Sequence, residues 1–153
     1  MDKSVLISIR PKWCDLIAAG KKTIEVRKTR PKLVLPFKVY IYETLGKTEA
    51  PTFVDEEGHE IYQGRGKVIG EFICDWIKDF GFSYYNHGEY IGIDNLSEKS
   101  CLYFEDLYEY IGESFGYGWH ISNLKIYDEP KELSDFGLKR PPQSWCYVKG
   151  EQK

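Results

Sequence analysis

Short runs rich in β-branched and aromatic residues recur along the whole chain, and this pattern restricts it to a β-rich fold. The runs are residues 4–9 (SVLISI), 37–43 (FKVYIYE), 66–76 (GKVIGEFICDW), 118–127 (GWHISNLKIY) and 144–149 (SWCYVK). A further segment, 22–28, alternates in polarity, so Ile24 and Val26 share one face of a strand. The other face carries Thr23, Glu25 and Arg27. Because closing a sheet removes its exposed edges, five or six such strands predict a small mixed β-barrel.

Two helices are expected beside these strands, which makes the fold class α+β. Pro11 is suited to a first helical position, and Gly20 marks the end of that helix. The second helix covers about 103–111 and is closed by Gly112. Its inward face is expected to consist of Phe104, Leu107, Tyr108 and Ile111.

Length and composition indicate one folded domain over 1–153. The chain has 153 residues, of which 42% are hydrophobic and 16% aromatic, so it can bury a core and is not a disordered tail. Residues 44–65 are polar and acidic and predict an inserted loop or hairpin. Residues 79–95 are rich in Gly and Tyr and predict a long loop.

The sequence also predicts a cytoplasmic protein without a metal or cofactor. The sequence contains no run of about eighteen apolar residues, so no membrane span is predicted. Residues 1–13 lack the hydrophobic core of a secretory signal. The four cysteines are far apart and form no CxxC pair, which indicates reduced thiols and no zinc site.

Positive charge is concentrated near the start of an acidic chain. The formal net charge is −3, yet residues 10–32 contain eight Lys and Arg against two acidic residues. Such a block is either a solvated face or a surface that focuses an anionic ligand.

Several segments together resemble the ASCH domain, a branch of the PUA-like β-barrel superfamily. They are SIRPKWCDLIAAGKKTIEVRKTRP, GKVIGEFICD, YGWHISNLKIYDEP and LKRPPQSWCYV. The resemblance implies a mixed PUA-like barrel with two or three flanking helices and a cleft beside the first helix, lined by the residues after Gly20. It also implies RNA or nucleotide-like ligands, since some small members hydrolyse acetylated cytidine or cleave RNA.

The family's acetylcytidine amidohydrolases carry a catalytic lysine after the helix glycine and a threonine three residues later. Lys22 matches the lysine, and Glu25 stands where the threonine is expected, so these two residues are the catalytic candidates. Strand alternation places Lys22 on the face opposite Glu25, at a helix-to-strand turn open to solvent. A charged Lys22 that binds an anion is therefore expected. The candidate ligand-binding residues are Lys12, Lys22, Thr23, Glu25, Arg27, Arg30, Trp119 and His120.

Three functions follow from these observations. The favoured one is a module that binds RNA or a nucleotide-like small molecule in a basic cleft. The second is a hydrolase acting on an acetylated nucleoside or on RNA, and the third is a protein-interaction module. The oligomeric state is left open.

Overall fold

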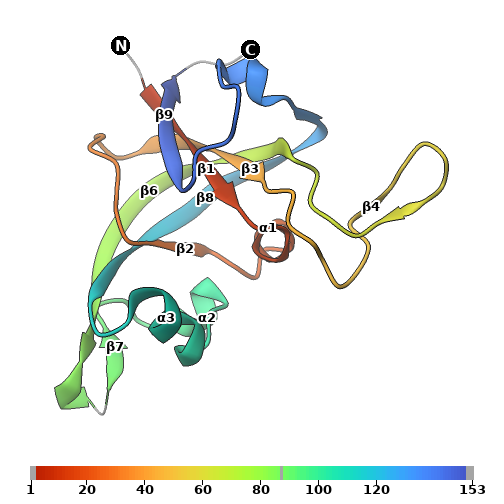
Figure 1. Ribbon diagram of the computed structural model, residues 1–153. Coiled ribbons are helices and arrows are strands. Elements are labelled where there is room, and N and C mark those ends of the chain that lie inside the picture. Colours follow the sequence, from red (N-terminus) through yellow and green to blue (C-terminus); the bar gives the residue numbers. More distant parts are fainter. Residues whose placement is uncertain (1–2, 87, 151–153) are drawn as a thin grey trace.

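The computed structural model describes residues 3–86 and 88–150 and has a mixed α+β architecture (Figure 1). Its main sheet has seven strands, six of which follow the order β2-β8-β6-β3-β1-β9 while β7 pairs with β6. β1 and β3 are parallel and the other pairs are antiparallel. The strands are β1 (Lys3–Ile9), β2 (Ile24–Arg27), β3 (Phe37–Glu43), β6 (Lys67–Ser83), β7 (Glu89–Ile91), β8 (Phe115–Lys131) and β9 (Trp145–Lys149).

Backbone pairing does not close this sheet into the expected barrel. Among the described strands, the path ends at β2 on one side and at β9 on the other, and these two ends are not paired. Side chains connect them instead, because Arg27 of β2 hydrogen-bonds to the Ser8 carbonyl of β1 and to Ser144, just before β9. The mixed sheet is therefore as expected, whereas a closed barrel is not observed.

Residues 79–95 are not one long loop. β6 continues to Ser83 and pairs with β8 as far as Gly81, so the strand runs well past the predicted end at residue 76. Phe80 is buried on this extension, which explains why Gly81 beside it does not break the strand. The 3₁₀ turn η1 (Tyr84–Asn86) and β7 follow, and then α2 (Leu96–Ser100).

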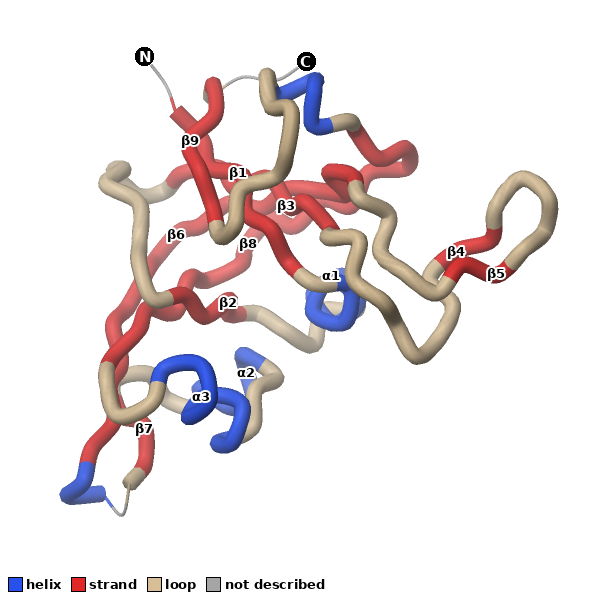
Figure 2. The backbone as a smooth tube through the Cα atoms, in the orientation of Figure 1, coloured by secondary structure: helices blue, strands red, loops and turns tan. Residues whose placement is uncertain are grey.

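A small hairpin projects from the body between β3 and β6, where a loop or hairpin is expected (Figure 2). Its strands, β4 (Phe53–Val54) and β5 (Glu60–Ile61), form a separate two-stranded sheet. The base of the hairpin is tight, because a Cβ on Gly64 would lie 1.6 Å from the Thr44 carbonyl oxygen. Arg65 also pairs there with the buried Glu43, at 3.2 Å.

The helices begin and end where local chemistry favours it. α1 (Pro11–Ala18) has proline at its start and is followed by Gly20 with φ +77°. α3 (Phe104–Ile111) begins with the Asp106 carboxylate accepting from the Tyr103 amide at 2.9 Å. The 3₁₀ turn η2 (Leu133–Phe136) precedes β9.

Two of the four residues expected on the inward face of α3 are not buried. Leu107 and Ile111 are buried, but Phe104 is 42% and Tyr108 41% exposed. The helix rests on the sheet through a narrow apolar face, so its aromatic residues remain partly exposed.

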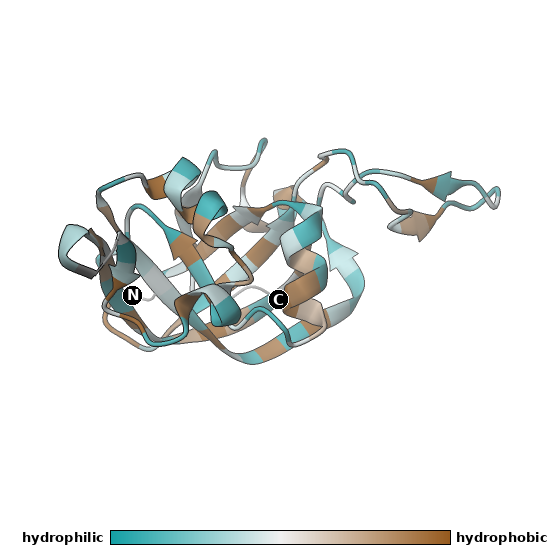
Figure 3. Ribbon diagram, turned by 90° about the horizontal axis from the view of Figure 1, so that it is seen from below, coloured by the Kyte–Doolittle hydropathy of each residue, from teal (hydrophilic) through white to brown (hydrophobic). Residues whose placement is uncertain are grey.

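Three buried clusters hold the layers together, and hydrophobic and hydrophilic residues alternate along the strands (Figure 3). The largest packs α1 against the sheet and includes Trp119. A second cluster joins β2 to α2 and α3 and contains Ile24, Val26 and Leu107. Burial of Ile24 and Val26 fixes the orientation of β2, because Glu25 between them must then point to the opposite face.

Candidate functional site

A cleft of about 780 Å³ lies beside α1, bounded by β2 and α3. Its floor contains three charged side chains of the segment 22–28, which are Lys22, Glu25 and Arg27. Four cationic and three acidic residues line it, so the cleft is less basic than the sequence block suggests. The remaining lining residues are Ser8, Ile9, Arg10, Trp13, Val26, Lys28, Thr29, Thr44, Leu102, Asp106, Glu109, Tyr110, Gln143 and Ser144.

Lys22 is buried, contrary to the expectation of an open turn. Only 2% of its side chain is exposed. Its Nζ donates to the Ser100 carbonyl at 2.6 Å and lies 3.4 Å from Glu25 Oε1. The prediction that Lys22 and Glu25 lie on opposite faces of a strand is also wrong. β2 begins only at Ile24, so strand alternation does not extend back to Lys22. The backbone amide of Lys22 is instead bonded to the Leu16 carbonyl at the end of α1.

The Lys22 ammonium is surrounded by acceptors. Besides Ser100 and Glu25, it lies 5.2 Å from the centroid of the Trp13 ring. A carbonyl, a carboxylate and an aromatic face together suit a cation. Lys22 therefore connects α2, β2 and α1 at the floor of the cleft.

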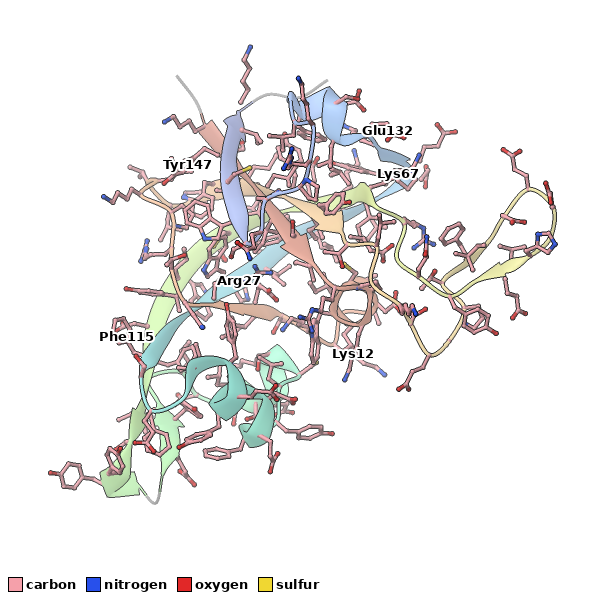
Figure 4. All side chains as sticks on the ribbon, viewed as in Figure 1. Lys12, Arg27, Lys67, Phe115, Glu132 and Tyr147 are labelled. Atoms are coloured by element: carbon pink, nitrogen blue, oxygen red, sulfur yellow. The ribbon has the colours of Figure 1, made fainter. Side chains whose placement is uncertain are left out.

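Arg27 uses its whole guanidinium group to join separate segments. Its Nε donates to Glu25 Oε2 at 2.8 Å, its Nη2 to the Ser8 carbonyl at 2.7 Å, and its Nη1 to Ser144 Oγ at 3.0 Å. Figure 4 shows Arg27 between β2 and the lower end of β9. Lysine cannot reproduce this planar set of donors.

Glu25 lies between these two cations, with its side chain 8% exposed. Burial alone would raise the pKa of Glu25, but the charges of Lys22 and Arg27 and the hydrogen bonds from both residues outweigh it. The net effect is a lowered pKa, so Glu25 is a carboxylate at neutral pH. The floor thus combines two cations with one anion.

The other predicted ligand-binding residues lie outside the cleft lining. Thr23 contributes its backbone, donating to Lys99 and accepting from Ile121. The Lys12 Nζ lies 4.8 Å from the Trp13 ring centroid, and Arg30 is half-buried beyond the lining residues.

Trp119 and His120 also lie away from the cleft, for different reasons. Trp119 is 0% exposed and belongs to the core, where its Nε1 donates to the Thr29 carbonyl at 3.3 Å. His120 points to the opposite face of β8. There it contacts Asp75 at 2.6 Å and stacks on Trp76.

Several cleft residues were not singled out from the sequence. Asp106, Glu109 and Tyr110 form one wall, and their i, i+3, i+4 spacing on α3 is a helical signal that was available. Ser8 and Ser144 had no such signal, because only the sheet order brings β1 and the segment before β9 to Arg27.

Within residues 3–86 and 88–150, no group of three or more His, Cys, Asp or Glu side chains is placed to hold a metal ion. No helix in the same ranges has the length and hydrophobicity needed to span a bilayer.

Comparison with known proteins agrees with the fold. A structure of an ASCH protein from Zymomonas mobilis has a TM-score of 0.66 and 20% identity, covering 95% of this chain and 87% of that chain. Two mutant forms of that protein match similarly, with TM-scores of 0.67 and 0.65 and identities of 19% and 18%. Their coverage is 97% and 95% of this chain, and 91% and 88% of theirs. No significant match was found among curated proteins. The ASCH domain family model matches residues 7–131, and the chain therefore belongs to the ASCH domain family, whose fold is PUA-like.

Proposed function

We propose that this protein binds a nucleotide-like ligand, either free or as one residue of an RNA strand, in the cleft beside α1. The observation that carries the proposal is the charge of the floor. Lys22 and Arg27 are 2% and 12% exposed and share the single carboxylate of Glu25, which leaves one excess positive charge in a mostly buried place. A phosphate group would compensate that charge.

The size and walls of the cleft support the same ligand class. A volume of about 780 Å³ is within the range of small-molecule sites. Trp13 and Tyr110 offer aromatic surface for a base, while Arg10 and Lys28 add positive charge at the opening. Asp106 and Glu109 can accept hydrogen bonds from base amino groups, and they disfavour a long polyanion lying along this wall.

The test compares two double variants that remove equal charge from the same basic block. Arg10→Gln with Lys28→Gln changes exposed residues of the cleft lining, whereas Lys21→Gln with Lys32→Gln changes exposed residues outside it. Calorimetric titration with nucleoside 5′-monophosphates, the matching nucleosides and oligouridine measures affinity. We expect the monophosphates to bind better than the nucleosides, and the first pair to weaken binding about tenfold.

The second pair should change the affinity by less than about twofold. Equal losses in both double variants would mean that the block attracts anions without a defined site. Equal binding of nucleosides and monophosphates would remove the role proposed for the floor.

Hydrolysis of an acetylated nucleoside is a second candidate, favoured by the distance of 3.4 Å between Lys22 Nζ and Glu25 Oε1. A buried lysine beside a carboxylate is able to relay a proton when water cleaves an amide into acetate and amine. Acetate release from acetylcytidine by the wild type, lost in a folded Lys22→Met variant, would establish it. Incubation with RNA tests cleavage in the same way.

A further inference from the structure

A second cavity, of about 660 Å³, lies between β7, α2 and the start of α3. It shares no lining residue with the cleft beside α1. Its floor is apolar and formed by Ile93, Leu96 and Leu107, all buried, while Tyr90 and Phe104 line its sides. The cavity therefore offers an apolar side chain a place away from water.

Aromatic side chains continue from this cavity onto the surface. Phe82, Tyr90, Phe104 and Tyr108 contact one another with ring centroids 5.6 to 5.9 Å apart, and we call these four residues the aromatic face. Phe104 and Tyr108 are 42% and 41% exposed, and Tyr84 against Phe82 is 68% exposed. A contiguous exposed apolar surface next to a cavity is typical of an interaction site.

The charge around the aromatic face selects the kind of partner. Residues 89–113 contain seven acidic residues and one lysine. Glu89 and Glu98 line the cavity, and no Lys or Arg is among its lining residues. RNA and anionic membranes would be repelled here, and a two-fold dimer would place this acidic surface against itself. A cationic segment gains from the carboxylates and from the faces of the rings.

We propose that the cavity and the aromatic face dock a cationic segment of another polypeptide, with an apolar side chain inserted between Lys or Arg residues. The apolar side chain occupies the floor formed by Ile93, Leu96 and Leu107. The cations pair with Glu89 and Glu98 and stack on the aromatic face. The proposal is independent of the cleft beside α1, because a different set of residues carries it.

The experiment uses two fluorescein-labelled peptides of equal length and charge, Arg-Leu-Arg-Leu-Arg and Arg-Gly-Arg-Gly-Arg. Fluorescence anisotropy should give about tenfold tighter binding of the leucine peptide, because only that peptide fills the apolar floor. Glu89→Gln with Glu98→Gln should weaken its binding about tenfold. The matched control, Glu56→Gln with Glu57→Gln, removes the same charge from exposed positions on the projecting hairpin and should leave the affinity unchanged.

Phe104→Ala provides a test that leaves charge untouched. Phe104 is partly exposed and is not a member of the three buried clusters, and circular dichroism checks that the fold persists. Weaker binding of the leucine peptide by this variant supports docking at the aromatic face. Equal affinity for the two peptides, or equal loss in both glutamate pairs, would each overturn the proposal.

Discussion

Glu25 links the stability of the protein to pH, because its carboxylate is held between Lys22 and Arg27. Its pKa is lowered in the folded state from an ordinary value of 4.5. The stabilisation is therefore complete above that value and is lost as the pH falls through the lower pKa of the folded protein. We expect the free energy of unfolding to decrease on acidification through this range.

Replacement of Glu25 by Gln should lower the free energy of unfolding at about pH 7 by roughly 3–5 kcal/mol, because two buried cations lose their counterion. Urea denaturation at a series of pH values provides the measurement. The difference between variant and wild type should shrink in acid, where the wild-type carboxylate is protonated as well. Glu57→Gln, on the exposed hairpin, is the control. A difference that stays constant with pH would contradict the role assigned to Glu25.

The projecting hairpin is attached to the body through a tightly packed glycine at its base. A Cβ at position 64 would meet the Thr44 carbonyl oxygen at 1.6 Å and the Pro11 ring at 2.7 Å. We expect Gly64→Ala to destabilise the protein by about 1–3 kcal/mol, because the backbone at the start of α1 or at the hairpin must move.

Gly46→Ala is a matched control for that variant. It lies in the same connection, but its added Cβ would be 3.6 Å from the nearest atom, Thr44 Oγ1, which is an ordinary contact. Thermal denaturation of both variants gives the comparison. Similar melting temperatures for the two would show that the hairpin base adapts freely.

The elements that the sequence predicts well are those with a strong local pattern. The apolar run of β1 and the alternation of Ile24 and Val26 determine burial directly, and both are buried. The far end of β6 cannot be predicted from its local sequence, because its pairing with β8 outweighs the local preference of Gly81. The position of the Lys22 side chain depends on where β2 begins. A shift of one residue in the start of a strand moves a side chain from one face of the sheet to the other.

The remainder of the cleft depends on contacts between distant parts of the chain. Asp106, Glu109 and Tyr110 belong to the site only because α3 packs on β2 through the second buried cluster. Tryptophan is a residue type that often contacts ligands, but Trp119 is completely covered by the residues of the largest buried cluster. Local periodicity contains neither piece of information.

At the scale of the whole molecule, Arg27 connects the two unpaired ends of the main sheet. It bonds to β1 and to the segment before β9 while belonging to β2. Arg27→Lys retains the charge but loses most of these hydrogen bonds, and we expect a loss of about 1–3 kcal/mol in the free energy of unfolding. Arg140→Lys, at an exposed position, serves as the control.

Hydrogen exchange should locate the effect of Arg27→Lys. Amides of β2 and β9 should exchange faster in this variant, whereas the central pairing of β6 with β8 should remain protected. Uniformly faster exchange throughout the sheet would indicate a general loss of stability and would contradict a local connection at the sheet ends.

The pairing of β1 with β9 has a consequence for the stage of synthesis at which the fold can be completed. β1 is synthesised long before its antiparallel partner β9, which includes Lys149, and the Ser144 that bonds Arg27 lies 117 residues after Arg27. Until β9 and the segment before it have been made, one edge of the apolar strand β1 has no partner, and Gln143 and Ser144 are missing from the cleft lining. Such distant pairings form slowly. That edge of β1 is therefore open to pairing with other strands during synthesis, and the cleft is complete only after β9 has been made.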